Sequence, residues 1–441
     1  MSCAHYFDRT DHGDSCFSVD TAAITFGRGA LAEAGHQARA LGCRRVALFT
    51  DQVVAGLPVL AEVRRALHEA GVEAVVYDQV RIEPNQTSFA SATAFYQSDD
   101  FDGAVSVGGG SVIDTAKAAL VYATYPAPFL RYINQPIGEG VAVPGLLPPH
   151  IACPTTSGTG SECTGIAVCS VPIDGDRTVF VKTGLAHRSL RPRLALIDPV
   201  CTETLPASVV AISGFDVLCH AIESYTALPH TKRARPGSSL LRPMSQGANP
   251  FSDVGSLEAI RLCGRYLLRA IGDRGDHEAR DQMMFAATLA GIAFGNAGVH
   301  VPHAMAYAIG GLACSLRLPD YPSERTLVPH GLAVVWSAPA AIRHLAKACP
   351  ERHLRCAEAL GCSVRDVAAE DAGALLSGEL QTLILKSGLP VQLGAAGFTR
   401  ADVPTLCEGA SLQTRLLGNA PLMLTESDLA AMFTDSMAEV T

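Results

Sequence analysis

Short apolar runs alternate with amphipathic segments through the first half of the chain. The runs RRVALFTD (44–51), VEAVVYD (72–78) and FDGAVSVGGG (101–110) are rich in valine and end at polar or glycine residues, as buried strands do. Between them, PVLAEVRRALHEAG (58–71) and SFASATAFYQSDD (88–100) have the apolar spacing of helices. Strands that alternate with helices predict βαβ units and a parallel sheet.

The pattern changes near Pro206. The last strand signal is the short run ALIDP (195–199), and after it the apolar positions follow a helical period, as in ASVVAISGFDVLCHAIESYTA (207–227) and HEARDQMMFAATLAGIAFGNAG (277–298). We therefore predict an α/β domain with a Rossmann-like parallel sheet over residues 1–205, followed by an all-α domain over residues 206–441.

Composition limits the class of protein. Of the 441 residues 48% are hydrophobic and only 17% are charged, so there is material for two large cores. The net charge of −9 gives no electrostatic footprint for nucleic acid, and none is expected as a partner. The N-terminus MSCAHYFDRTDHGDS has neither the apolar region of a secretory signal nor the arginine-rich, acid-poor composition of a transit peptide, and no run of about 18 apolar residues is present. These features predict a cytoplasmic protein without a membrane partner.

Two loops have the composition of ligand-binding loops. GAVSVGGGSVIDTAKAAL (103–120) places three glycines between a strand and a helix, where backbone N–H groups and the helix dipole can hold an anion. The motif is neither G-x-G-x-x-G nor a P-loop, so a structural turn explains it equally well. Asp51 stands at the end of its strand. Its carboxylate fits either of two roles, accepting hydrogen bonds from an adenosine ribose or capping the N-terminus of a helix. CPTTSGTGSECTG (153–165) is a second loop of small polar residues.

The helical half contains candidate metal ligands. Asp216 and His220 are four residues apart and so lie on one face of the predicted helix. His300, His303 and His330 follow at distant positions. One carboxylate and three imidazoles would hold a divalent ion such as Fe²⁺ or Zn²⁺ with a coordination position left for substrate. Each histidine taken singly also fits a structural role, and the spacing alone leaves a metal site and an ion pair both open.

Four motifs in order give a specific resemblance. They are GGGSVIDTAK (108–117), PTTSGTGSE (154–162), DVLCHAIESY (216–225), and VPHAMAYAIGG with VPHG (301–311 and 328–331). Together they resemble the iron-containing, or group III, alcohol dehydrogenase family over almost the whole chain. The resemblance implies the dehydroquinate synthase-like fold of that family, with an α/β dinucleotide-binding domain before a helical metal-binding domain. It also implies an oxidoreductase that uses NAD and Fe²⁺ or Zn²⁺.

The resemblance assigns roles to individual residues. The family's metal ligands fall on Asp216, His220, His303 and His330, and His300 is left as a structural neighbour. Its nucleotide contacts fall on Asp51, Gly109, Gly110, Ser111, Asp114, Thr155, Thr156, Thr159 and Ser161, and Lys182 matches the lysine near the nicotinamide ribose.

One departure from the family indicates a branch. Many members have a second histidine four residues after the third ligand, and this chain has Tyr307 there. This residue, the loop RPMSQGANPFSD (242–253) and the segment HRSLRPRLALIDP (187–199) resemble the hydroxyacid–oxoacid transhydrogenase branch. That branch transfers hydride from 4-hydroxybutyrate to 2-oxoglutarate, yielding succinate semialdehyde and 2-hydroxyglutarate. Tyr307 becomes a candidate catalytic residue in place of the histidine of the usual proton relay.

Two alternatives and a substrate site stay open at this point. The chain could instead be an NAD-dependent alcohol or hydroxyacid dehydrogenase with exchangeable NADH, or a non-catalytic nucleotide-binding protein. For the carboxylates of hydroxyacid and oxoacid substrates, Arg242 and Asn249 in the long loop 228–252 are the candidates. A homodimer or larger homo-oligomer is expected.

Overall fold

The structure is a computed structural model that describes residues 6, 10–173, 176–312, 314, 316–318 and 328–437. The chain forms two compact units, Thr21–Leu205, and Met1–Asp20 together with Pro206–Thr441. The predicted range 1–205 for the α/β domain therefore needs a correction at its start. The segment before Thr21 belongs to the helical unit because its polar groups bond there: Asp14 pairs with Arg242 at 2.8 Å, and the Asp20 N–H donates to Asn296.

The α/β unit is built on a parallel sheet, as the sequence predicted, and this sheet has six strands. The strand order is β1-β8-β5-β4-β2-β3, and every pairing is parallel. The strands are β1 (Ala23–Phe26), β2 (Arg45–Phe49), β3 (Glu73–Tyr77), β4 (Gly103–Gly108), β5 (His150–Pro154) and β8 (Leu194–Ile197). The weak signal at 195–199 is therefore also a strand, and it pairs with β5 and β1 inside the sheet.

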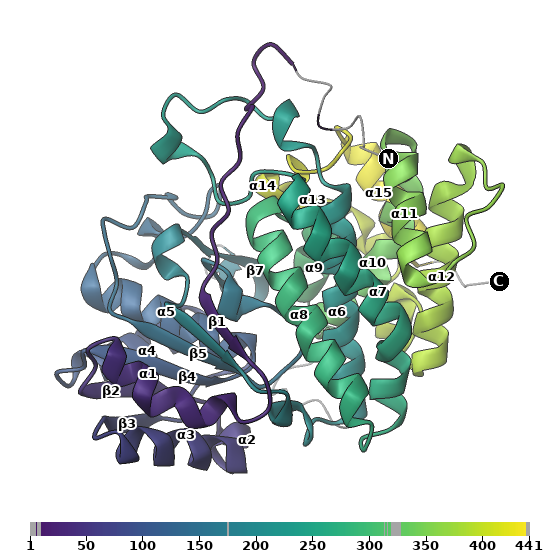
Figure 1. Ribbon diagram of the computed structural model, residues 1–441. Helices are drawn as coiled ribbons and strands as arrows, with labels where there is room; N and C mark the ends of the chain where they lie inside the picture. The colour runs from purple at the N-terminus through teal and green to yellow at the C-terminus, as the bar shows by residue number, and fades with distance from the viewer. Residues whose placement is uncertain are drawn as a thin grey trace. The chain divides into compact units, whose positions relative to one another are not determined.

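Helices cover both faces of this sheet (Figure 1). They are α1 (Ala34–Ala40), α2 (Gln52–Ala55), α3 (Pro58–Glu69), α4 (Gln86–Gln97) and α5 (Gly110–Thr124). Side chains alternate along each strand, so Val46 and Leu48 of β2 pack in one core with α1 and α3. Ala47 and Phe49 point the other way and pack in a second core with α4 and α5. A strand buried on both faces reads as a continuous apolar run, which is why its sequence signal was strong.

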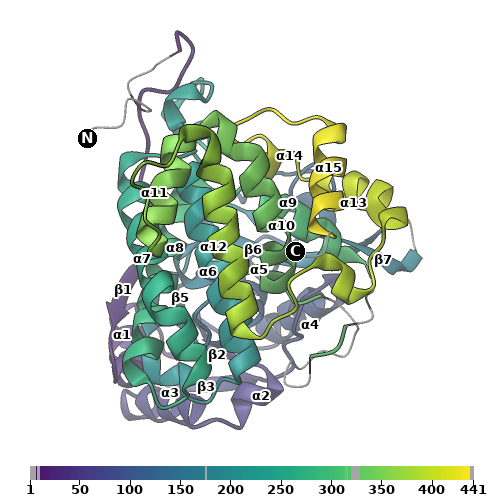
Figure 2. The ribbon, with the colours of Figure 1, turned by 90° about the vertical axis from the view of Figure 1, so that its right-hand side faces the viewer.

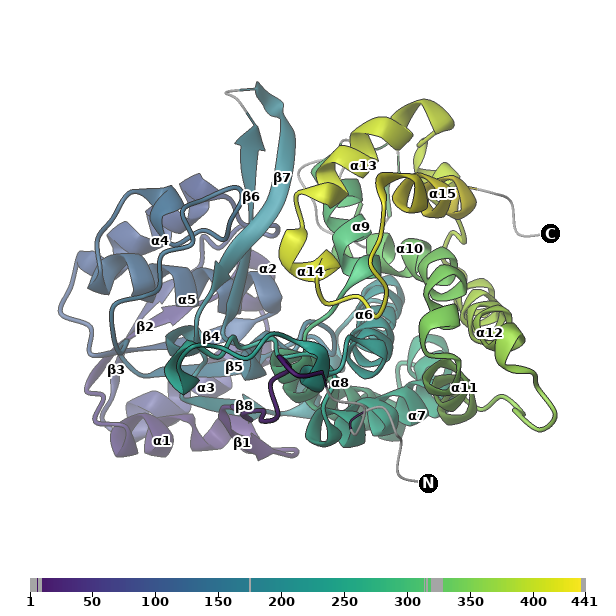
Figure 3. The same cartoon turned by 90° about the horizontal axis from the view of Figure 1, so that it is seen from above.

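An antiparallel hairpin accompanies the sheet and was not predicted. Its strands are β6 (Ile166–Ile173) and β7 (Asp176–Ala186), and Figure 3 shows them as a long two-stranded arm beside α4 and α5. β7 carries Lys182. The hairpin was missed because its apolar residues are interrupted by proline and by charges, which weakens the alternation that marks a strand.

The second unit is helical (Figure 2). Its helices are α6 (Ala207–Thr226), α7 (Pro250–Gly272), α8 (His277–Ala297), α9 (Val301–Gly311), α10 (His330–Leu345), α11 (Pro350–Leu360), α12 (Ala372–Ser387), α13 (Val403–Ser411), α14 (Thr414–Leu417) and α15 (Glu426–Ser436). By length and hydropathy α6 could cross a membrane, and so could the bent pair α8 and α9 taken as one span. In α6, however, 78% of the apolar window is buried inside the structure, as in a core helix.

Candidate metal and nucleotide sites

Three ionisable residues lie on one face of the central helix α6. Asp216, His220 and Glu223 occupy positions i, i+4 and i+7, which stack along a helix of 3.6 residues per turn. All three side chains are buried, with exposed fractions of 4% or less. Because charged groups are rarely buried without partners, this face requires compensating groups from neighbouring helices.

Two further helices supply those groups. His303 lies in the first turn of α9, and His330 is the first residue of α10. The start of α10 approaches α6 very closely at Gly331, where an added Cβ would lie only 2.2 Å from the carbonyl oxygen of Ile212. Glycine is therefore required at this contact, and it lets His330 reach the α6 face.

The three imidazoles converge on one carboxylate oxygen. Nε2 of His303 lies 3.5 Å from Oδ1 of Asp216, and Nε2 of His220 lies 3.7 Å from it. Nε2 of His330 is 4.0 Å from the same oxygen. Oδ1 of Asp216 and Nε2 of His303 are buried, and within the described part of the chain neither atom has a hydrogen-bond partner. Buried polar atoms are normally satisfied, so this oxygen and these nitrogens fit a divalent cation held by one carboxylate and three imidazoles.

The charges around the cluster favour a cation. Burial by itself raises the pKa of Asp216, but the imidazoles of His220 and His330 outweigh burial and hold this pKa well below its usual range. Burial lowers the pKa of His303, whereas Glu223 and Asp216 raise it, and the net result is a pKa of about 9. The two buried carboxylates thus stabilise positive charge at the centre of the cluster.

Glu223 is a functional candidate that the sequence analysis missed. Its Oε2 bonds to Nδ1 of His303, and its Oε1 accepts from the backbone N–H groups of His300 and His303 at 3.0 and 3.1 Å. A carboxylate on the second ring nitrogen fixes the tautomer of a metal-binding histidine. The signal was present in the sequence, because Glu223 lies three residues after His220 on the same helical face.

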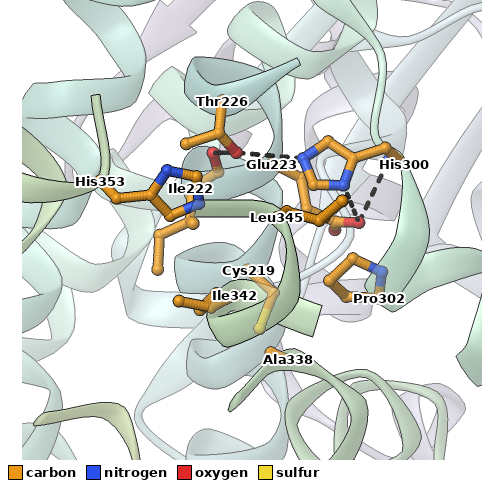
Figure 4. A pocket seen from close by; sticks show the side chains of 10 residues that line it. All are labelled: Cys219, Ile222, Glu223, Thr226, His300, Pro302, Ala338, Ile342, Leu345 and His353. Carbon is orange, nitrogen blue, oxygen red and sulfur yellow. Dashed lines mark hydrogen bonds and ion pairs between the residues drawn. The ribbon is translucent and has the colours of Figure 1, made fainter. Parts of the chain in front are cut away.

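His300, which the resemblance left outside the ligand set, bonds to the ends of two helices. Its Nδ1 accepts from the Val301 N–H at 2.8 Å, and its Nε2 lies 3.0 Å from Oγ1 of Thr226. Figure 4 shows this ring beside a small cavity, with Glu223 on the same side and His353 across from it. The ring thus caps α9 and bonds to the end of α6.

Tyr307 lies next to the histidine cluster. Its ring centroid is 5.7 Å from that of His330, and both side chains are partly exposed. By contrast, the ring of His220 is stacked between Phe294 and His303 at 4.1 and 4.6 Å. The cluster is therefore closed on the His220 side and open on the side of His330 and Tyr307.

The predicted nucleotide residues follow adjacent strands of the sheet. Asp51 comes after β2, the glycines 108–110 end β4, and Thr155 and Thr156 follow β5. β4 pairs with both β2 and β5, and β2 and β4 form the point at which the strand order reverses. Ligands of α/β sheets bind outside the carboxyl ends of the strands at such a point.

The two glycine-containing loops contact each other there. A Cβ added to Gly110 would lie 2.7 Å from the side chain of Thr159, and one added to Gly109 would lie 3.4 Å from Thr156. The Thr155 N–H donates to the Gly108 carbonyl at 3.0 Å. The N-terminus of α5 has no side-chain cap, which leaves its first N–H groups available to an anion.

The predicted nucleotide contacts separate into two groups by exposure. Partly exposed and able to meet a ligand are Asp51, Gly109, Gly110, Ser111, Thr156 and Thr159, whereas Thr155, Asp114, Ser161 and Lys182 are buried. Asp51 also caps α2 through the Val53 and Val54 N–H groups. Lys182 pairs with Glu83 at 2.6 Å.

Buried residues next to these loops hold them in place. The one with the most loop contacts is Lys117, which the sequence analysis missed. Nζ of Lys117 donates to the carbonyl and the hydroxyl of Ser161 and to the Ile166 carbonyl, at 2.6 to 2.7 Å. Asp114 accepts from the Ser161 hydroxyl at 2.5 Å and from the Val168 N–H at 2.9 Å. Burial lowers the pKa of Lys117 to about 8, although nearby Asp114 raises it. Asp114 and Ser161 therefore help to position the loop, and their predicted contact with the nucleotide stays a prediction.

Two substrate candidates also need correction. The guanidinium of Arg242 bonds to Asp14 at 2.8 Å and to the hydroxyl of Ser18 at 3.3 Å. Asn249 is fully buried, and its side chain caps α7 by accepting from the Ser252 N–H at 2.9 Å. Both residues fix the loop that precedes α7, so we no longer place them at the substrate.

Comparisons with known proteins agree with this fold. Residues 21–199 match the family model for iron-containing alcohol dehydrogenase, and residues 243–437 match that for the C-terminal part of the same family. The mitochondrial hydroxyacid-oxoacid transhydrogenase of Bos taurus is 44% identical over 426 residues, which cover 96% of this chain and 90% of that protein. The Homo sapiens protein of the same name is 43% identical over the same shares. The crystal structure of a 1,3-propanediol oxidoreductase superposes with a TM-score of 0.82 at 28% identity, covering 96% of this chain and all of that one.

These relatives contradict the predicted cytoplasmic location, because they are named as mitochondrial proteins. The polar N-terminus was therefore a poor guide to the compartment. The predicted resemblance and its transhydrogenase branch are confirmed, since the identity is above 40% across nearly the whole chain. The chain belongs to the iron-containing alcohol dehydrogenase family.

Proposed function

We propose that this protein is a metal-dependent hydroxyacid–oxoacid transhydrogenase. It moves hydride from 4-hydroxybutyrate to a bound nicotinamide and from there to 2-oxoglutarate, which yields succinate semialdehyde and 2-hydroxyglutarate. The observation that carries the proposal is the convergence of three imidazoles on Oδ1 of Asp216. The identity to transhydrogenases supports the choice of substrates.

The four converging side chains are the proposed ligands of Fe²⁺ or Zn²⁺, since oxygen and imidazole donors accept either ion. When bound, the metal supplies Lewis acidity that favours the ionised form of the substrate hydroxyl. Glu223 keeps the His303 proton on Nδ1, so that Nε2 presents its lone pair to the site. The stacking of Phe294 on His220 excludes water from that side.

The loops at the carboxyl ends of β4 and β5 are the proposed seat of the nicotinamide nucleotide. Gly109 and Gly110 let the backbone approach the pyrophosphate, and the uncapped start of α5 adds its dipole. Asp51 offers a carboxylate oxygen to the adenosine ribose, and the same charge disfavours a 2′-phosphate, which selects NAD. The nucleotide supplies the acceptor and donor of hydride.

Tyr307 is the proposed proton-transfer residue. It stands beside His330 on the open side of the cluster, where the family often has a histidine. In the first half-reaction its hydroxyl oxygen accepts the proton of the hydroxyacid while its own proton passes to solvent, and in the second half-reaction the same relay runs in reverse to the oxoacid. The two half-reactions thus balance in hydride and in proton, with no net change in the nucleotide.

The test is an assay of metal-loaded protein with 4-hydroxybutyrate and 2-oxoglutarate and no added nucleotide. The proposal expects 2-hydroxyglutarate to form over many turnovers per protein molecule. A strict requirement for added NAD would instead indicate a dehydrogenase with exchangeable NADH. Elemental analysis of protein purified without chelators is the matched measurement, and absence of stoichiometric metal would argue for a non-catalytic nucleotide-binding protein.

A further inference from the structure

The proposed substrates share one chemical feature besides the reacting carbon. In 4-hydroxybutyrate two methylene groups separate the carbinol carbon from the carboxylate. In 2-oxoglutarate two methylene groups separate the keto carbon from the distal carboxylate. A single cationic group at a fixed distance from the metal could therefore bind both acids. Arg242 does not supply it, because its guanidinium is paired with Asp14.

Two other arginines of the helical unit have no acidic partner. Nη1 of Arg233 donates to Oδ1 of Asn419 at 2.6 Å, and Nη1 of Arg415 is 3.5 Å from Oγ of Ser245. Among the residues that the structure describes, no carboxylate lies within 4.0 Å of either guanidinium. Both arginines are half-buried, so each is partly withdrawn from water.

The neutral partners of the two guanidiniums lie close together, because Asn419 and Ser245 both pack against Gly298. Burial lowers the pKa of Arg233, and the charge of Arg415 lowers it further. Like charges in a partly desolvated place are unfavourable unless an anion joins them. Guanidinium is also the group best shaped to bind a carboxylate through two parallel hydrogen bonds. The pair therefore has the charge of an anion site, with neutral side chains as its hydrogen-bond partners.

This pair is connected to the metal cluster by short contacts. Asn419, the partner of Arg233, donates to the carbonyls of Ala297 and Val299 at 3.1 Å, on the turn between α8 and α9. A Cβ added to Gly298 in that turn would lie 2.8 Å from Nδ2 of Asn419 and 2.9 Å from Cβ of Ser245. The partners of both arginines thus pack on the residues that lead into α9, which carries His303.

Tyr307 on α9 is the third residue that relates Arg415 to the histidine cluster. Arg415 lies on α14, which packs against α9, and the phenol of Tyr307 is close enough to interact electrostatically with its guanidinium. On its other side, Tyr307 is 5.7 Å from the ring of His330. Arg415 therefore lies on a helix that packs against α9, the helix that carries both His303 and Tyr307.

We propose that Arg415 and Arg233 form the carboxylate-binding site of this protein, which holds the remote carboxylate of hydroxyacid and oxoacid while the reacting carbon lies at the metal cluster. This inference rests on the proposed function and adds to it the residues that select acids over neutral alcohols. It also gives a reason for a shared site, because the same two-methylene spacing occurs in the donor and the acceptor.

The experiment measures binding of 2-oxoglutarate to the metal-loaded full-length protein by isothermal titration calorimetry. Arg415→Gln and Arg233→Gln are each expected to raise the Kd by at least about tenfold, as removal of one partner from a desolvated charge pair does. Arg415→Lys, which keeps the charge and loses the two-pronged geometry, should fall between Arg415→Gln and the wild type. Arg261→Gln is the matched control, because Arg261 pairs with Glu258 on the exposed side of α7.

The metal content and thermal midpoint of each variant show whether it is folded. An unchanged Kd in folded Arg415→Gln and Arg233→Gln would overturn the inference, and so would a wild type that does not bind 2-oxoglutarate. The KM for 4-hydroxybutyrate should rise in the same variants. If wild type binds 2-oxoglutarate through Arg415 but needs added NAD for turnover, the inference stands and the transhydrogenase proposal fails. If the wild type turns over without added nucleotide and Arg415→Gln keeps the wild-type Kd for 2-oxoglutarate, the transhydrogenase proposal stands and the carboxylate-site inference fails.

Discussion

The carboxylate of Glu223 bonds to Nδ1 of His303, and Nε2 of the same ring lies 3.5 Å from Oδ1 of Asp216. One imidazole thus joins two buried carboxylates from the same helix, one on each ring nitrogen. Because Glu223 also accepts two backbone N–H groups at the start of α9, its position is fixed independently of any metal. The orientation of the His303 ring is therefore set before a cation binds.

Replacing Glu223 by glutamine should weaken metal binding. The amide keeps the size of the side chain and loses its charge, so His303 is held less firmly and is less basic. Loss of such a partner lowers metal affinity by about 10- to 100-fold. Competition with a chelator of known affinity measures the change, and Glu258→Gln on the exposed face of α7 is the control. Equal affinities in the two variants would refute the role of Glu223.

Substitution of His303 should remove the metal, whereas substitution of the nearby His300 should leave the metal content unchanged. His303→Ala removes a proposed ligand, so we expect loss of stoichiometric metal and of activity together. His300→Asn retains a side chain able to cap α9, and the ring it removes faces Thr226 rather than Asp216, so the metal should be kept. Elemental analysis decides, and a metal-replete, active His303→Ala would show that the ligand is misassigned.

His150 should make the free energy of unfolding depend on pH. Burial, and then the charge of Lys117, lower the pKa of His150 in β5 to about 3. As the pH falls below the unfolded value of about 6.5, the unfolded chain binds a proton that the folded protein rejects. Stability is therefore full above that value and is lost toward pH 3, by about 2 kcal/mol at pH 5.

His150→Gln removes this titration and retains a polar partner for the Ser106 hydroxyl, which lies 2.8 Å from Nε2 in the wild type. Its free energy of unfolding, measured by urea denaturation at pH 8 and pH 5, should fall less than that of the wild type. The exposed His68→Gln serves as control. Parallel losses in all three proteins would exclude His150 as a source of acid sensitivity.

Arg352 should be important for stability. It is buried, donates to the Tyr225 carbonyl at 2.6 Å and pairs with Asp253 at 2.5 Å, while Tyr6 donates to the same carboxylate. Arg352→Met leaves Asp253 charged without its cation, and breaking a buried pair costs about 3–5 kcal/mol. Denaturant unfolding measures the loss, and Arg261→Met on the surface should change stability by less than about 0.5 kcal/mol.

The double variant Arg352→Met with Asp253→Asn tests the physical cause. If the penalty comes from the unpaired carboxylate, removing its charge should restore a large part of the lost stability. If the double variant is no more stable than Arg352→Met, packing rather than charge accounts for the effect.

Local pattern was enough for the elements of both units. Strands such as β2 and β4 lie in the interior of the sheet and are apolar on both faces. Each is therefore recognisable in the sequence as a continuous apolar run of at most six residues. The helical period of α6 likewise placed Asp216 and His220 on one face, but their spacing left a metal site and an ion pair both open, and only the family resemblance favoured a metal. The β6–β7 hairpin has no such continuous signal, and its pairing is seen only in the folded chain.

The amino-acid sequence by itself determined the alternation of strands and helices before Pro206, the change of architecture there and, through four ordered motifs, the family. Tertiary structure alone brought His303 and His330 to Asp216, gave Glu223 its place behind His303, and joined the segment before Thr21 to the helical unit. It also paired Arg242 with Asp14 and gave Arg233 and Arg415 the neutral partners Asn419 and Ser245. The physical reason is that periodicity records how neighbouring residues share a face, whereas contacts between distant segments depend on how whole elements pack.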